Sequence, residues 1–126
     1  MSNEPLLILV AGPYRSGTND DLRKLADNLE AMNRAALEVY RAGHMPVTGE
    51  ALALPLCELA GSTCVGDAAF NEVFHPFARR LLAHCDAVLR IGGPSAGADD
   101  MVAQARREGK LVFTSIEQLP RHGEPL

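Results

Sequence analysis

Four short apolar segments, separated by longer segments of helical character, constrain the fold of this chain more than any other feature. They lie at residues 6–11, 44–48, 87–92 and 111–115. The first of them, LLILVA, is typical of a strand that is buried on both faces. Strands of this kind that alternate with amphipathic helices predict an α/β protein with a parallel sheet covered on both sides.

The segments between the predicted strands carry apolar residues at helical spacing. They predict helices over 20–43, 68–84 and 96–109, and a helix over 49–61 that Pro55 interrupts. We expect Thr18 or Asn19 to cap the first helix. The tail from Ile116 adds a short helix in this interpretation.

The order of the elements limits the possible topologies. With right-handed crossovers, the most economical arrangement is a flavodoxin-like, Rossmann-like doubly wound parallel sheet with strand order 2-1-3-4. An extra element at one edge of the sheet remains open. No linker or repeat divides the 126 residues, so we expect one domain over 1–126. In such a fold, ligands bind at the carboxyl ends of the first and third strands, where the connections diverge.

The loops that follow these two strands are rich in glycine and serine. They read GPYRSGTND (12–20) and GGPSAGADD (92–100). Glycines allow the backbone to approach a ligand closely, and the amides that start the second loop's helix can hold an anion. The alternative is that both loops are ordinary turns. The predicted substrate-binding residues are Gly12, Pro13, Tyr14, Arg15, Ser16, Gly93, Ser95 and Gly97.

In this interpretation each group has a part. Arg15, Ser16, Ser95 and Gly97 hold phosphate or ribose, while the ring of Tyr14 flanks the base or sugar. His75 could approach the same cleft, although a packed or solvated histidine is the more ordinary reading. The expected partner is therefore a small molecule, a nucleoside or nucleotide.

Composition and motifs exclude several other classes of protein. The net charge of −4 argues against a nucleic-acid partner, and no apolar run is long enough to cross a membrane. Three cysteines without a CxxC pair suggest reduced thiols in a cytoplasmic protein, with no metal site. No P-loop, dinucleotide fingerprint or serine-nucleophile elbow is present, so we expect no bound cofactor.

The segments LILVAGPYRSG, GHMPV and HCDAVLRIGGPSAGADDMVAQARREGKLVF resemble the nucleoside 2-deoxyribosyltransferase-like superfamily. This superfamily includes the 2′-deoxynucleoside 5′-phosphate N-hydrolases, and the resemblance covers roughly residues 6–115. It implies a flavodoxin-like fold, a homodimer or higher homo-oligomer with sites near subunit contacts, and cleavage of an N-glycosidic bond. The nucleophile implied is a carboxylate, typically a glutamate on the helix after the S-x-G loop.

The position that the resemblance assigns to this glutamate is occupied by Met101. We therefore expect Asp100, with Asp99 beside it, to supply a displaced catalytic carboxylate. The alternative is a purely structural role, since acids in the first turn of a helix interact favourably with the positive end of its dipole. A second acid of the family would fall near Ala78, which is another departure. Other acids that could substitute are Glu50, Asp67 and Glu72.

Two functions follow from this mixed pattern. The first is a hydrolase or transferase that acts on the N-glycosidic bond of a nucleoside or nucleotide. The second is a nucleotide-binding or sensor module without chemistry, which the methionine at position 101 favours. A purely structural subunit is a third and weaker alternative.

Overall fold

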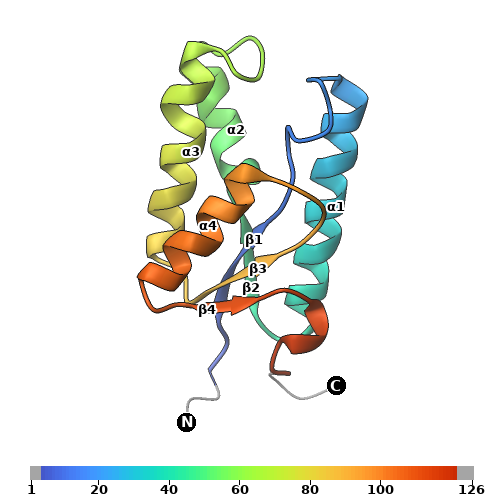
Figure 1. Cartoon of the computed structure of the whole chain (residues 1–126), viewed down its shortest axis with the longest axis vertical. Helices are drawn as coiled ribbons and strands as arrows, with labels where there is room; N and C mark the ends of the chain where they lie inside the picture. Colours follow the sequence, from blue (N-terminus) through green and yellow to red (C-terminus); the bar gives the residue numbers. More distant parts are fainter. Residues whose placement is uncertain (1–3, 122–126) are drawn as a thin grey trace.

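The computed structural model describes residues 4–121 and contains a four-stranded parallel sheet in the order β2-β1-β3-β4 (Figure 1). This confirms the predicted fold class and strand order. Residues 1–3 and 122–126, which the single-domain prediction also includes, lie outside the described residues. The strands are β1 (Leu7–Ala11), β2 (Met45–Thr48), β3 (Ala87–Arg90) and β4 (Leu111–Phe113). The helices are α1 (Leu22–Arg41), α2 (Gly49–Leu59), α3 (Ala68–Ala83), α4 (Ala96–Arg107) and the 3-10 helix η1 (Ile116–Gln118).

Helices cover both faces of the sheet, as Figure 1 shows. Side chains of a strand alternate between the two faces, and in β1 both sets are buried. Ile8 and Val10 pack in a cluster with α1 and η1, while Leu9 and Ala11 pack in a second cluster with α3 and α4. The central strand of the sheet is therefore buried on both sides.

A third apolar cluster joins α2 to α3. It consists of Ala53, Cys57, Phe70 and Phe74. The sequence predicted a helix broken at Pro55, but α2 continues through this residue. Pro55 has no N–H to donate to the preceding turn, and α2 packs against α3 through Ala53 and Cys57, on either side of this residue.

The start of α1 differs from the expected one. Asp21, rather than Thr18 or Asn19, caps the helix by accepting hydrogen bonds from the N–H groups of the first turn. Asn19 and Asp20 adopt positive φ angles of 48° and 58°, so the chain is still turning at these positions and the helix begins later.

One edge of the sheet is formed by β2, which contains Pro46. The Met45 N–H donates to the Leu6 carbonyl, so alternate residues direct their N–H groups toward β1. Pro46 stands at the position whose N–H would point outward. It therefore costs the sheet no hydrogen bond.

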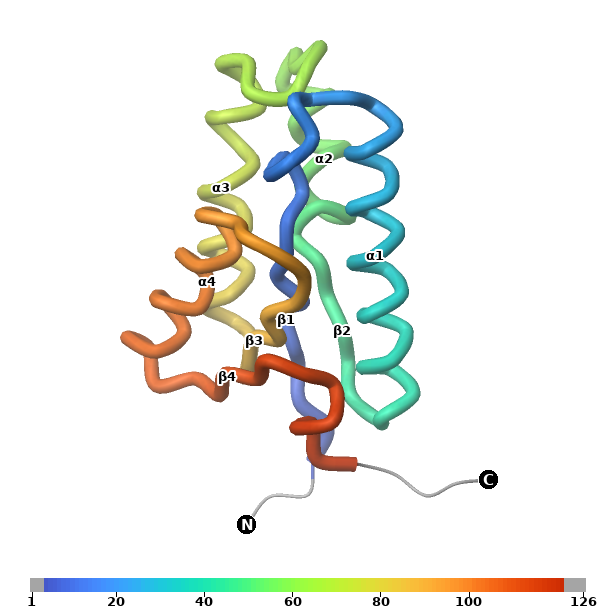
Figure 2. Tube along the Cα trace, turned by 45° about the vertical axis from the view of Figure 1, so that its right-hand side comes forward, coloured from blue at the N-terminus to red at the C-terminus, as the bar shows by residue number. Residues whose placement is uncertain are grey.

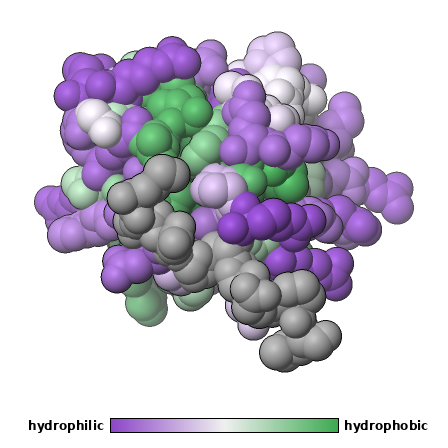
Figure 3. Space-filling view, turned by 90° about the horizontal axis from the view of Figure 1, so that it is seen from below, coloured by the Kyte–Doolittle hydropathy of each residue, from purple (hydrophilic) through white to green (hydrophobic). Residues whose placement is uncertain are grey.

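The opposite end of the molecule from the β1–α1 and β3–α4 loops is largely hydrophilic, with a few hydrophobic side chains between the polar ones (Figure 3). Within residues 4–121, no helix is both long and apolar enough to span a membrane. Two of the cysteines, Cys57 and Cys85, are buried, and Cys64 is exposed.

Candidate functional site

The two Gly/Ser-rich loops meet at the carboxyl ends of β1 and β3, as the topology predicts (Figure 2). A cavity of about 510 Å³ lies between them, a volume suited to a small ligand. It is lined by six of the eight predicted binding residues, namely Gly12, Tyr14, Arg15, Ser16, Ser95 and Gly97. Residues of α2, α3 and α4 complete the lining, including Glu50, Phe74, His75 and Met101.

The β3–α4 loop presents the start of α4 to this cavity. Ser95 caps the helix, because its Oγ accepts a hydrogen bond of 3.1 Å from the Ala98 N–H. The hydroxyl proton of Ser95 is not used by this bond. Gly97 lies against His75, and a Cβ at position 97 would stand 3.3 Å from Cε1 of the imidazole. The absence of a side chain at Gly97 thus lets His75 approach the helix terminus.

Two of the predicted binding residues, Pro13 and Gly93, are not part of the cavity lining. Pro13 packs against Gly92, where a Cβ would stand only 2.7 Å from Pro13 Cδ. The Gly93 carbonyl accepts a hydrogen bond from the Arg90 guanidinium. Pro13 therefore helps to hold the two loops together, and Gly93 supports the β3–α4 loop.

The two acids predicted to be catalytic also lie outside the cavity lining. Asp99 accepts hydrogen bonds from Arg90 Nε and Nη2 at 3.2 and 3.1 Å, and its side chain is 71% exposed. Asp100 is exposed, and its charge acts on His75. Successive helical residues differ by about 100° in direction. Met101 takes the inward position, where it is buried and lines the cavity.

Two of the alternative acids have other roles or positions. Asp67 caps α3, and the N–H groups of Phe70 and Thr63 lower its pKa to about 2. Glu72 is exposed on α3 and does not line the cavity.

Glu50 is the acid that the structure does bring to the cavity. It lies in the first turn of α2, directly after β2, and only 7% of its surface is exposed. Burial raises the pKa of its carboxyl group to about 7, although a hydrogen bond with its own backbone acts in the opposite direction. Sequence reasoning named Glu50 only as a substitute. Its position at the carboxyl end of a strand was the signal in its favour.

Aromatic rings form one wall of the cavity. Tyr14 stacks on Phe74 with ring centroids 5.6 Å apart, and His75 meets the edge of Phe74 at 5.2 Å. Burial, with the charge of Glu50 next in importance, raises the pKa of Tyr14. Burial, followed by the charge of Arg79, lowers the pKa of His75. Both side chains are therefore uncharged at neutral pH and can donate or accept hydrogen bonds.

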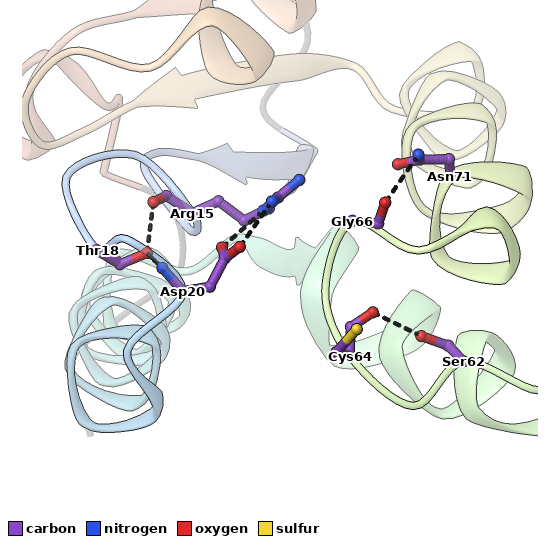
Figure 4. Close-up of polar contacts among 7 residues, drawn as sticks. All are labelled: Arg15, Thr18, Asp20, Ser62, Cys64, Gly66 and Asn71. Atoms are coloured by element: carbon purple, nitrogen blue, oxygen red, sulfur yellow. Dashed lines mark hydrogen bonds and ion pairs between the residues drawn. The ribbon is translucent and has the colours of Figure 1, made fainter.

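Arg15 is held by its own loop. Its Nε and Nη2 donate to the two carboxylate oxygens of Asp20 at 3.0 and 2.9 Å (Figure 4). Its guanidinium also stands 5.8 Å from the centre of the Phe70 ring. The hydrogen bond to Asp20 raises the pKa of Arg15, and the same bond lowers the pKa of Asp20.

Gly12 offers a direct test of how closely the backbone is packed under the cavity. A Cβ at this position would stand 2.9 Å from both Cγ1 and the carbonyl oxygen of Ile91, and 2.9 Å from Met32 Sδ. We expect Gly12→Ala to lower the free energy of unfolding by about 1–3 kcal/mol, measured by urea denaturation. Gly93→Ala is the control, since a Cβ there meets nothing within 4 Å. Equal stability of the two variants would contradict the prediction.

Among the residues that the structure describes, no group of three or more His, Cys, Asp or Glu side chains is arranged to hold a metal ion. Comparison of the chain with protein-family models, with curated proteins and with solved structures finds no match in any of the three.

Proposed function

We propose that this protein binds a nucleoside or nucleotide in the cavity and cleaves its N-glycosidic bond, with Glu50 as the carboxylate. The observation that carries the proposal is the position of Glu50, which is buried and yet lines the cavity. Acids with raised pKa values in a cleft of this kind are candidates for a functional role. The resemblance to the deoxyribosyltransferase-like superfamily supports the same reaction.

The proposed reaction uses the ionised form of Glu50. As the bond between the sugar carbon and the base breaks, its electron pair leaves with the base nitrogen, which takes up a proton from solvent water. Positive charge develops on the sugar, and the carboxylate stabilises this centre or forms a bond to it. Water, or a second free base, then bonds to the sugar carbon and gives up a proton, which completes hydrolysis or transfer. A desolvated carboxylate is well suited to this role because no water competes for its charge.

The remaining cavity groups position the substrate. The base lies against the rings of Tyr14 and Phe74, where its own aromatic ring displaces water from both side chains. The Ser95 hydroxyl and the amides at the start of α4 lie where sugar hydroxyls can accept or donate hydrogen bonds.

The test is release of free base from a panel of nucleosides and 5′-monophosphates. We expect release by the wild-type protein, with a rate that rises between about pH 6 and pH 8 as Glu50 ionises around its pKa of about 7. Glu50→Gln should lower the rate by roughly 10⁴-fold. A wild-type protein that is folded but releases no base from any member of the panel would count against the reaction.

A second function, nucleotide binding without chemistry, is favoured by Met101. This thioether is buried and lines the cavity where the resemblance implies the catalytic glutamate. A binding module would be stabilised by a nucleotide that stays intact, by about 2.7 kcal/mol at a hundredfold excess over Kd. Thermal unfolding combined with chromatography of the recovered nucleotide separates the two functions.

The same proposal includes a cytoplasmic location and a homodimer or higher homo-oligomer, both of which the resemblance or composition suggested. Light scattering of the purified protein measures the oligomeric state.

A further inference from the structure

The charges around the cavity are unevenly distributed. Among the described residues that line it, Arg15 is the one permanent cation. Two acids, Asp20 and Glu50, line the same cavity. His75 adds no charge at neutral pH, because its pKa is lowered. The lining therefore has no excess of positive charge with which to bind an anion.

The cation in this lining is already paired. The Arg15 guanidinium uses its Nε and Nη2 for Asp20 in a two-pronged hydrogen bond. Its opposite side lies against the α2–α3 loop, where a Cβ on Gly66 would stand 2.7 Å from Nη2 (Figure 4). Because two of its three nitrogens donate to Asp20, a phosphate that bound Arg15 would have to share the guanidinium with this carboxylate.

The loop that carries Asp20 is built to hold this pairing. Thr18 is buried, and its hydroxyl donates to the Arg15 carbonyl and accepts from the Asp20 N–H (Figure 4). The positive φ angles of Asn19 and Asp20 turn the carboxylate back toward Arg15. The pairing is thus fixed within one short loop before any ligand binds.

A 5′-phosphate would meet this arrangement at a disadvantage. It carries about −1.5 to −2 charges at pH 7 and would lie in the same cavity as the carboxylates of Asp20 and Glu50. The amides at the start of α4 can also donate hydrogen bonds to a neutral hydroxyl.

We propose that Asp20 determines specificity: by neutralising Arg15 it makes the cavity select uncharged nucleosides over their 5′-monophosphates. This inference rests on the proposed function only in naming the nucleoside as the ligand. The charge selection itself is a property of Arg15 and Asp20.

The test compares dissociation constants for a nucleoside and its 5′-monophosphate, measured by calorimetry with Glu50→Gln as the background to prevent turnover. In this background we expect the nucleoside to bind more tightly. Adding Asp20→Asn should tighten binding of the monophosphate by about tenfold relative to the nucleoside, because a charge-assisted partner of Arg15 becomes neutral. Asparagine has nearly the same shape as aspartate and tolerates the positive φ at this position.

Asp21→Asn is the matched control. It removes the same charge from the neighbouring residue, which caps α1 and does not line the cavity, and asparagine is also a good helix cap. The preference should stay unchanged in this variant. A monophosphate that binds the background protein more tightly than the nucleoside would overturn the inference, and so would equal effects of Asp20→Asn and Asp21→Asn.

A salt titration tests the same inference without any substitution at Asp20. Because Arg15 and Asp20 neutralise each other and Glu50→Gln removes the remaining charge of the lining, rising ionic strength should leave binding of both the monophosphate and the nucleoside nearly unchanged. Binding of the monophosphate that weakens with salt would contradict the proposal.

Failure of the proposed function gives a distinct result. If no nucleoside binds and no base is released, the nucleoside proposal fails, and inorganic phosphate becomes the probe for the charge selection. Phosphate should then raise the Tm of Asp20→Asn by more than it raises the Tm of the wild-type and Asp21→Asn proteins. Equal Tm shifts in all three would overturn the inference about Asp20.

Discussion

Glu50→Gln is expected to stabilise the protein at pH 8 and to have little effect at pH 4. Burial raises the pKa of Glu50 in the folded protein to about 7, whereas the ordinary pKa of a glutamate carboxyl, as in the unfolded chain, is 4.5. The favourable contribution of the uncharged carboxyl is complete below 4.5 and is lost as the pH rises through 7. The loss amounts to on the order of 3 kcal/mol above pH 7. Glutamine at position 50 stays neutral at every pH, so the variant does not suffer this loss of stability.

Urea denaturation at several pH values between 4 and 8 measures this effect. Glu58→Gln is the control, because it removes the same charge from an exposed position on α2. Curves of stability against pH that run parallel for Glu50→Gln and the wild type would show that the carboxyl is not desolvated. The result also bears on function. If Glu50 carries the reaction, the protein gives up stability near neutral pH to keep an ionised carboxyl in the cavity, and such a loss of stability in exchange for activity is common at active sites.

Phe70→Ala is expected to cause the largest loss of stability, about 3–5 kcal/mol. The Phe70 ring is 1% exposed and stacks on Phe74 with centroids 4.6 Å apart. It also underlies the Arg15 guanidinium. Its removal would leave a void between α2 and α3, beside Cys57 and Phe74.

Urea denaturation of Phe70→Ala and Phe70→Leu measures the loss, with the leucine variant expected to lie between the alanine variant and the wild type. Leu59→Ala is the control, since Leu59 is 85% exposed. An alanine variant as stable as the control would mean that the two helices do not depend on this ring.

The fold could be predicted from the sequence because its signals are local. In β1, four successive residues from Ile8 to Ala11 are buried on alternating faces, and a continuous apolar run reports this directly. Right-handed connections then left few strand orders. The meeting of Tyr14 and Ser95 at one cavity followed from that order, since both loops leave the same end of the sheet.

Glu50 was not the first choice for the catalytic acid, because its burial in the cavity depends on tertiary contacts rather than on the residues next to it in the sequence. Glu50 is buried by helices that lie far along the chain, and a charged residue after a strand looks like an ordinary helix cap. The direction of Asp100 depended on the rotation of α4, which packing of Met101 determines. The pairing of Arg15 with Asp20 required two residues with positive φ, a conformation that the sequence around Asn19 does not reveal.

The placement of Pro46 in β2 bears on how copies of this chain can associate. Of the backbone donors on the outer side of that strand, the proline removes one, and the other belongs to Thr48, where α2 is about to begin. A strand of a second molecule placed against β2 could therefore form very few backbone hydrogen bonds with it. At the β2 edge, self-association would therefore depend on side chains rather than on backbone pairing, and an extended amyloid-like stack of strands could not grow from it.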